Sequence, residues 1–251
     1  MVKRAVIVGI NYYDHPNMSL RGCINDAYNI RQHLIDRRGY TLADLTLLTD
    51  EYTNRRTNRY PTRDNIIAAI SQAVTKTKSE DTLFIHISSH GTSVTDHNGD
   101  ERDGKDEAMV SADNKLIIDD EFKEFLVNKM PAGSKLRVLM DLCHSGTALD
   151  LPYNWRQGGF TKESAEVDGS HDCIMLSGTY DAHVSYDAKI GGDFSGVFTH
   201  HIVKILSTAK PTLTWKELLE TLCSRIEKAK FDQIPQLSMG SKELLTMPVD
   251  L

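Results

Sequence analysis

The sequence of 251 residues lacks several features that would mark particular classes of protein. No apolar run approaches the roughly 18 residues of a membrane-spanning helix. The N-terminus, MVKRAVIVGI, has too short an apolar stretch for a signal peptide and no small-residue cleavage site. A basic excess is also missing, because the net charge is −6, whereas nucleic-acid-binding surfaces are usually basic. We therefore expect neither a membrane nor a nucleic acid as a partner.

Cysteine is scarce and scattered, with four residues at Cys23, Cys143, Cys173 and Cys223. Small secreted domains held by disulfides are far denser in cysteine, and the absence of a CxxC pair argues against a zinc ribbon. The HExxH pattern is absent, and the ten histidines show no ligand spacing, which argues against a metal hydrolase. We expect free thiols in a reducing, cytoplasmic compartment.

Hydrophobic residues make up 40% of the chain and charged residues 25%, which is typical of a globular protein with a full core. Ala5–Ile10 is a continuous apolar run, as expected for a strand that is covered on both faces. Cys23–Arg37 has apolar residues at helical spacing, and Gly39 predicts its end. Similar patterns predict strands at 45–48, 83–87, 136–140, 173–176 and 236–239, and helices following Thr62 and at 119–129, 196–206 and 215–230.

This alternation of strands and helices predicts an α/β fold, with a mostly parallel central sheet of about six or more strands flanked by helices. We expect residues 1–251 to form a single domain. A polar, glycine-bearing linker at about 153–172 is predicted to divide a large part, about 1–152, from a small part, about 173–251.

Two of the predicted strands are followed by residues with unusual chemistry. His90 follows the strand at 83–87, and Cys143 follows the strand at 136–140. In open α/β sheets, sites form at the carboxyl ends of the strands. A thiol attacks a carbonyl well only as thiolate and needs a nearby base, so we predict Cys143 as nucleophile and His90 as its base. The backbone N–H groups of Gly91 and Cys143 are candidates for an oxyanion site. The alternative is a buried thiol and a core histidine.

The segments FIHISSHG and LRVLMDLCHSG resemble the histidine and cysteine motifs of metacaspases, within the caspase-like clan of cysteine peptidases. GCINDA, IIDDEF and IPQLS resemble three further motifs of that family. The five segments occur in the family's order between residues 22 and 238. The resemblance implies a caspase-like sandwich, a monomeric state and cysteine endopeptidase activity. The chain starts almost at its first predicted strand, which resembles a minimal type I arrangement.

The resemblance also implies cleavage after arginine or lysine in protein or peptide substrates. A desolvated cation needs a paired opposite charge, and the resemblance implies that Asp26, Asp141, Ser88 and Cys23 form the receiving pocket. Two alternatives stay open: Asp141 could be a carboxylate that caps a turn, and Asp26 could lie on a solvated helix face.

An acidic segment, DHNGDERDGKDE, occupies residues 96–107. It is not an EF-hand loop, because Glu101 stands where that loop needs glycine. Calcium takes six to eight oxygens, often from separated segments. The resemblance implies Ca²⁺ ligands at Asp103, Asp119, Asp120 and Asp150. The alternative is a charged surface loop beside a helix N-terminus.

Basic residues in two predicted loops are candidates for self-cleavage, although they could simply be exposed bases. They are Arg156 and Lys162 in the linker, and Arg55, Arg56, Arg59 and Arg63 in an earlier loop. Two alternatives to a metacaspase peptidase also stay open. One is a catalytically silent caspase-like scaffold or binding module, against which the intact His90 and Cys143 argue. The other is a legumain-like or clostripain-like enzyme of the same clan.

Overall fold

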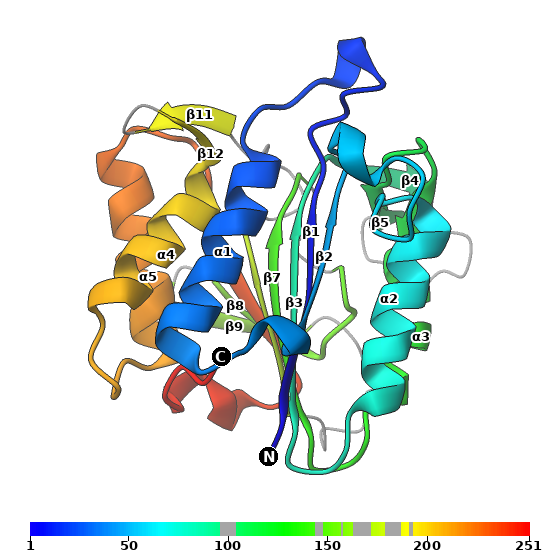
Figure 1. Cartoon of the computed structure of the whole chain (residues 1–251). Coiled ribbons are helices and arrows are strands. Elements are labelled where there is room, and N and C mark those ends of the chain that lie inside the picture. Colours follow the sequence, from blue (N-terminus) through cyan, green and yellow to red (C-terminus); the bar gives the residue numbers. More distant parts are fainter. Residues whose placement is uncertain (96–103, 144–147, 157, 163–171, 179–186, 191–192) are drawn as a thin grey trace.

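The structure, a computed structural model, describes residues 1–95, 104–143, 148–156, 158–162, 172–178, 187–190 and 193–251 (Figure 1). Its centre is an eight-stranded sheet with the order β2-β1-β3-β7-β10-β13-β8-β9. The strands are β1 Lys3–Gly9, β2 Leu45–Thr49, β3 Thr82–Ser88, β7 Lys135–Asp141, β8 Tyr153–Arg156, β9 Gly159–Lys162, β10 Asp172–Ser177 and β13 Gln236–Met239. The pairs from β2 to β10 are parallel and those from β10 to β9 antiparallel. This confirms the predicted mostly parallel α/β sheet.

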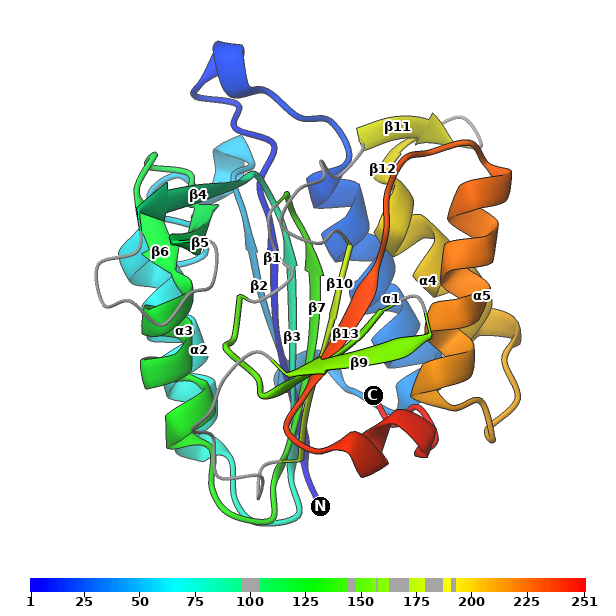
Figure 2. The ribbon, with the colours of Figure 1, turned by 180° about the vertical axis from the view of Figure 1, so that it is seen from behind.

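Helices cover both faces of the sheet (Figures 1 and 2). The helices α1 Cys23–Arg38, α4 Val197–Thr208 and α5 Trp215–Lys228 lie on one face. The helices α2 Arg63–Lys76 and α3 Asp119–Phe125 lie on the other. Among the described residues, no helix is both long enough and apolar enough to cross a bilayer.

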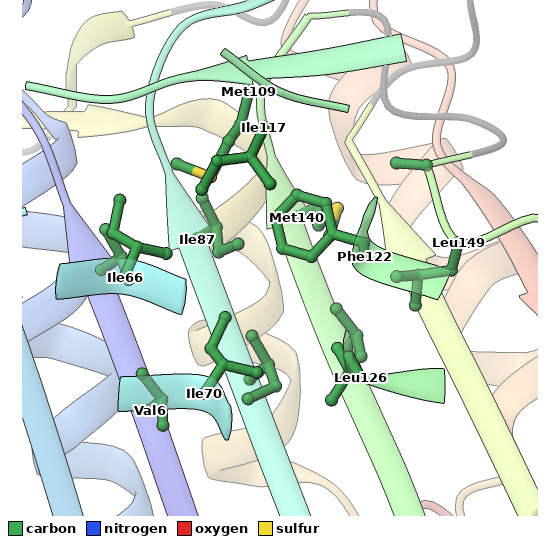
Figure 3. Close-up of a cluster of buried hydrophobic side chains, with 14 of the residues drawn as sticks. Val6, Ile66, Ile70, Ile87, Met109, Ile117, Phe122, Leu126, Met140 and Leu149 are labelled. Carbon is green, nitrogen blue, oxygen red and sulfur yellow. The ribbon is translucent and has the colours of Figure 1, made fainter. Parts of the chain in front are cut away.

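The apolar run of β1 is buried on both sides because side chains alternate along a strand. Val6 and Val8 pack in the core beneath α2 and α3, and Figure 3 shows the first of them beside Ile66 and Ile70 of α2. Ala5 and Ile7 belong to the opposite core, under α1, α4 and α5. All of these side chains are fully or almost fully buried.

Local sequence signals explain the helix ends. Gly39 ends α1 in the left-handed conformation, at φ 75°, which glycine adopts without the steric cost of a Cβ. The Thr62 hydroxyl accepts the Asn65 N–H and caps α2. Thr214 and Glu217 form a capping box at the start of α5. The helix predicted at 119–129 is shorter: α3 ends at Phe125, and a 3₁₀ turn, η4 Val127–Lys129, follows.

The segment 153–172 was predicted to be an irregular linker, and this is wrong for its first half. There, β8 and β9 form a hairpin within 153–162 that extends the sheet beyond β13. The Trp155 and Phe160 rings pack edge to face, with centroids 4.7 Å apart, and such cross-strand aromatic pairs stabilise a sheet. The rest of that linker, 163–171, lies outside the described residues. The expected large and small parts share one sheet, because β7 pairs with β10.

Five short strands that the sequence did not predict form two smaller sheets. One contains β4 Gly91–Thr95, β5 Lys105–Val110 and β6 Leu116–Ile118, and the other contains β11 Asp187–Ile190 and β12 Asp193–Gly196. Both lie near the end of the central sheet where β1 and its parallel neighbours finish (Figure 1). This end therefore carries the segments that can surround a site.

Candidate active site

The register of β3 and β7 brings the two catalytic candidates to the same place. Ser88 pairs with Asp141 as the last registered pair of this parallel ladder. His90 and Cys143 each follow two residues later. The loops continue side by side, because the Ser89 N–H donates to the Asp141 carbonyl at 3.3 Å. A Cβ placed on Gly91 would overlap the Cys143 carbonyl oxygen and lie 2.7 Å from Leu142 Cδ1. The structure thus joins the histidine and cysteine loops as the sequence predicted.

The half-buried His90 imidazole is held from two sides. Its Nε2 lies 2.7 Å from the Met18 carbonyl oxygen. A carbonyl only accepts, so this contact assigns the ring proton to Nε2 and leaves Nδ1 as the basic nitrogen. The Tyr12 ring packs against the imidazole, with centroids 4.7 Å apart. Tyr12 Oη accepts the His90 N–H at 2.9 Å and donates to the Val110 carbonyl at 2.6 Å.

Cys143 differs from the other cysteines in its surroundings. It is half-buried at a strand end, whereas Cys23 and Cys173 are buried. Burial raises the pKa of the Cys173 thiol to about 12 and that of Cys223 to about 11. These two thiols are therefore protonated and unreactive at neutral pH. This comparison favours Cys143 as nucleophile.

The predicted pocket acids lie together behind this site. Asp26 is fully buried, so the solvated-face alternative is wrong. Its Oδ2 accepts the Ser88 hydroxyl at 2.9 Å. The Gly196 N–H lies 3.0 Å from both of its oxygens, and the Ser195 hydroxyl donates to Oδ1. Burial and the charge of Asp141 raise the pKa of Asp26 well above its usual range.

Asp141, 3% exposed, accepts two hydrogen bonds at Oδ2 from Thr199, from N–H at 3.1 Å and from Oγ1 at 2.8 Å. Gly196 stands between the two acids: a Cβ there would overlap Asp141 Oδ2 and lie 2.7 Å from Asp26 Oδ2. Cys23, one helical turn before Asp26 on α1, is buried, and its carbonyl oxygen would lie 2.5 Å from a Cβ on Gly9. The structure therefore brings Asp26, Ser88 and Asp141 together, with Cys23 in the adjoining turn of α1.

A second group of acids lies where the start of β5 is next to the start of α3. Ligand atoms of Asp106, Asp119 and Asp120 lie within 4.8 Å of one another. Burial, then the charges of Asp150 and Asp106, raise the pKa of Asp119 to about 7, against hydrogen bonds from the backbone N–H groups of Glu107 and Asp120. Asp150 also pairs with Lys123 Nζ at 3.3 Å. Asp103 lies outside the described residues.

This acidic group fits a calcium ion in its chemistry. Its ligands are all carboxylate oxygens, the hard donors that Ca²⁺ takes. Carboxylates this close repel one another in a partly buried setting, and a divalent cation between them would offset that repulsion. The fit rests on Asp106, Asp119 and Asp120, with the charge of Asp150 close enough to act on Asp119.

The sequence profile of the metacaspase, peptidase C14 domain, matches residues 3–152, more than half of the chain. The chain belongs to the metacaspase family. It is 33% identical over 287 residues to metacaspase-1 of Cryptococcus neoformans, covering 94% of this chain and 62% of that protein. It is 34% identical over 241 residues to metacaspase-3 of Arabidopsis thaliana, covering 91% of this chain and 66% of that protein.

The fold of this metacaspase-family chain is also that of a solved caspase. Caspase-1 of Spodoptera frugiperda superposes with a TM-score of 0.61 at 14% identity, over 94% of this chain and 86% of that one. This likeness confirms the caspase-like architecture. The chain spans less than two thirds of the length of the curated metacaspases named above.

Several residues of this metacaspase site were missed by sequence reasoning. Met18 contributes a backbone carbonyl, and no side-chain pattern marks such a role. Thr199 and Gly196 lie at the start of α4. Thr199 contacts Asp141, 58 residues earlier in the chain, and Gly196 contacts Asp26, 170 residues earlier. Asp106 had a visible signal, since it stands in the acidic segment at 96–107, but the family resemblance directed attention to Asp103 instead.

Proposed function

We propose that this chain is a calcium-activated cysteine endopeptidase that cleaves after arginine or lysine, with Cys143 as nucleophile and His90 as base. The observation that carries the proposal is the shared position of these residues, each two beyond the paired Ser88 and Asp141. The Met18 carbonyl supports the role of the base, because it holds the His90 proton on Nε2. The nitrogen required for proton abstraction is then Nδ1.

The reaction follows from these groups. His90 Nδ1 takes the thiol proton, and the Cys143 sulfur attacks the scissile carbonyl carbon. The negative charge that develops on the carbonyl oxygen would be met by backbone N–H groups of Gly91 and Cys143. The proton on Nδ1 passes to the leaving amine, which departs. A water, deprotonated by the same nitrogen, then hydrolyses the thioester and regenerates the thiol.

The pocket supports a basic side chain before the scissile bond. Two carboxylates, Asp26 and Asp141, converge on Gly196 behind the nucleophile loop. A desolvated guanidinium or ammonium group requires such a partner. An acidic side chain would be repelled there.

Calcium would be held by Asp106, Asp119 and Asp120, close to Asp150. When bound, the ion would supply positive charge that neutralises these crowded carboxylates. The effect of calcium binding can reach His90 through backbone contacts of this chain. Asp106 lies on β5, which pairs with β4, and β4 begins at Gly91. At its other end, β5 donates the Val110 N–H to the His90 carbonyl at 3.0 Å.

Self-processing is part of the proposal, at the loop before α2. Arg56 and Arg59 are exposed there, whereas Arg55 pairs with Asp14 and Arg63 with Glu121. Arg156 and Lys162 lie in the paired strands β8 and β9. A strand that is already hydrogen-bonded is a poor peptidase substrate, so the loop is the better candidate. Intact-mass spectra of wild type with calcium, beside Cys143→Ala, test this: an uncut wild type would end the idea.

The four cysteines form no disulfide among the described residues, which supports a reducing compartment such as the cytoplasm. The β8–β9 hairpin supports a monomer, because it covers β13 and leaves only the four-residue β9 at that edge of the sheet. Light scattering after size-exclusion chromatography, with and without calcium, tests the oligomeric state.

The central experiment compares fluorogenic peptides that end in arginine, lysine or aspartate, first with millimolar calcium and then with chelator. We expect cleavage after arginine and lysine that disappears in Cys143→Ala and with chelator. Unchanged activity with chelator would contradict calcium activation, and cleavage after aspartate would contradict the pocket. Hydrolysis of none of the peptides would favour the alternative, a silent caspase-like scaffold.

A further inference from the structure

A cavity of about 490 Å³ opens beside the catalytic histidine and has no part in the pocket around Asp26 and Asp141. Three segments enclose it: the loop after β1, the start of β4 with the histidine before it, and the β5–β6 hairpin. Its lining includes His90, Gly91, Met18, Thr92, Val110 and Leu116. The volume falls within the range of about 300–1,000 Å³ that is usual for small-ligand pockets. The cavity is therefore large enough to bind part of a substrate.

The cavity and the acidic pocket lie on opposite faces of the central sheet. Val110 belongs to the core beneath α2 and α3, and Leu116 packs against the same core. The contacts of the two acids are with Gly196 and Thr199, at the start of α4 on the other face. Figure 1 shows the same arrangement, with β4 and β5 near α2 and β12 near α4. The catalytic residues thus have the acidic pocket on one side and this cavity on the other.

The chemistry of the proposed reaction decides which part of the substrate reaches the cavity. His90 passes its proton to the amine of the residue that follows the scissile bond, so that residue must lie against the imidazole. Side chains of an extended chain point alternately to opposite sides. When the side chain before the scissile bond enters the acidic pocket, the next side chain therefore points away from it, towards the cavity that His90 lines.

The lining of the cavity is apolar or neutral. Met18 and Leu116 are half-buried, and Val110 is 6% exposed. Among the described residues that line the cavity, His90 is the one titratable side chain, and the remaining polar groups are hydroxyls and amides, those of Ser19, Thr92, Asn17 and Asn114. A charged side chain bound there would lose water without gaining an opposite charge. The lining therefore favours an uncharged side chain.

The wall of the cavity is held by contacts within the protein. The Val110 N–H donates to the His90 carbonyl at 3.0 Å, and the Val110 carbonyl accepts the Tyr12 hydroxyl at 2.6 Å. The Leu116 carbonyl accepts Arg63 Nε at 2.9 Å. A site that is already in its binding conformation loses less conformational freedom when it binds a ligand.

We propose that this cavity binds the side chain that follows the scissile bond, and that it selects an uncharged, apolar side chain such as leucine. Met18, Val110 and Leu116 supply the apolar contacts, and Thr92 forms the wall on β4. The inference rests on the proposed endopeptidase activity and deepens it, because it adds a second selected position to the one before the scissile bond.

The test uses internally quenched peptides with arginine before the scissile bond and leucine, glycine, aspartate or lysine after it. For wild type with millimolar calcium, we expect kcat/KM of the leucine peptide to exceed that of the glycine peptide at least about fivefold, since a buried leucine side chain gains free energy from leaving water. We expect it to exceed the values for the aspartate and lysine peptides at least about tenfold, since both charges would be unpaired in the cavity.

Two variants change the cavity, each with a matched control. Leu116→Ala should lower the leucine-to-glycine ratio several-fold, whereas Leu213→Ala, at a half-buried leucine that packs against the opposite core, should keep it. Thr92→Lys places a cation in the cavity and should raise the aspartate-to-leucine ratio at least about tenfold. Thr95→Lys, the same substitution at the exposed end of β4, should leave that ratio as in wild type.

A second measurement examines the cavity after the first amine has left. An added amine can attack the Cys143 thioester in place of water, forming a new amide bond and releasing the thiol, while His90 takes the proton that the amine loses. At equal concentrations, leucinamide should divert more of the thioester into peptide than glycinamide does. Leu116→Ala should remove this difference.

Two results would overturn the inference alone: cleavage after arginine that is equally fast for all four peptides or fastest before a charged residue, and an aspartate-to-leucine ratio that Thr92→Lys leaves unchanged. A different result would overturn the proposed peptidase activity, and the inference with it. In that case none of the four peptides is cleaved, although iodoacetamide still alkylates Cys143 of the folded protein.

Discussion

Ser88 of β3 and Asp141 of β7 face each other as the last pair of a parallel ladder, and that pairing sets the geometry of the whole site. Because parallel strands run in the same direction, equal steps past a registered pair keep two chains side by side. His90 and Cys143 are each two steps past it, although 53 positions separate them in sequence. The pair itself also takes part in the pocket, since Ser88 donates to Asp26 and Asp141 accepts from Thr199.

The first prediction concerns the nucleophile and its base. Cys143→Ala and His90→Ala should each lower kcat/KM for an arginine peptide by at least about 10³-fold, because thiolate attack and proton transfer act as one unit. Cys223→Ala is the matched control, since the raised pKa of that thiol keeps it protonated. Initial rates with active-site titration measure the effect. Substantial hydrolysis by Cys143→Ala, or its loss in Cys223→Ala, would refute the assignment.

Much of the central sheet could be predicted because its parallel strands are buried on both faces. Such strands show as continuous apolar runs, as Ala5–Ile10 does. The helix ends at Thr62 and Gly39 could be predicted for a different reason. Each of these residues acts on backbone groups close to it in the sequence. The β8–β9 hairpin was missed, because four-residue strands in a polar segment show no clear period and depend on β13 for their pairing.

The positions of His90 and Cys143 after neighbouring strands could be predicted from the sequence, whereas several contacts around the candidate site could not. His90 and Cys143 stand after strands with recognisable flanking residues. The Met18 carbonyl that holds His90 could have come from any residue, so the sequence carries no sign of it. The contacts of Gly196 likewise depend on how α4 meets the sheet, which local patterns do not determine.

The second prediction concerns the close approach of the two catalytic loops. Gly91→Ala should lower activity at least about 10²-fold, since a Cβ would overlap the Cys143 carbonyl and displace the nucleophile loop. Gly159→Ala, where a Cβ meets nothing within 4 Å, should leave activity unchanged. Peptidase rates and thermal melting of both variants are the measurements. Full activity in Gly91→Ala would mean that the loops do not touch in solution.

The third prediction concerns calcium and stability. A ligand that binds only the folded state stabilises it by about 2.7 kcal/mol when present at 100 times its Kd. Millimolar calcium should therefore raise the melting temperature of wild type, and a chelator should reverse the rise. Asp119→Asn and Asp106→Asn should lose most of the calcium-dependent shift, because both side chains belong to the acidic group.

Glu124→Gln serves as the control for this set, since Glu124 is an exposed acid on the same helix as Asp119. It should keep the full calcium-dependent shift. An identical shift in Asp119→Asn, Asp106→Asn and Glu124→Gln would place the ion elsewhere and exclude this acidic group as the site.

The fourth prediction concerns an ion pair that joins the middle of the sheet to the C-terminus. Arg137 is almost completely buried and binds Asp250 through Nε at 2.7 Å and Nη2 at 3.0 Å. Asp250→Asn should lower the free energy of unfolding at pH 7 by about 1–2 kcal/mol. This is less than for a fully buried pair, because the Asp250 side chain is 35% exposed and water screens part of its charge.

The same pair should make stability depend on pH in a defined direction. Hydrogen bonds from Arg137, together with the charges of Arg137 and Lys135, hold the pKa of Asp250 below its usual value despite partial burial. A carboxyl group with a depressed pKa in the folded state stabilises it above the unfolded pKa of about 3.9, and loses that effect as pH falls through the folded pKa. The gap between wild type and Asp250→Asn should therefore be full at pH 7 and shrink below about pH 4. Urea unfolding of both proteins at pH 7, 5 and 3 measures it, and a gap that stays constant down to pH 3 would show that the charge of Asp250 contributes nothing.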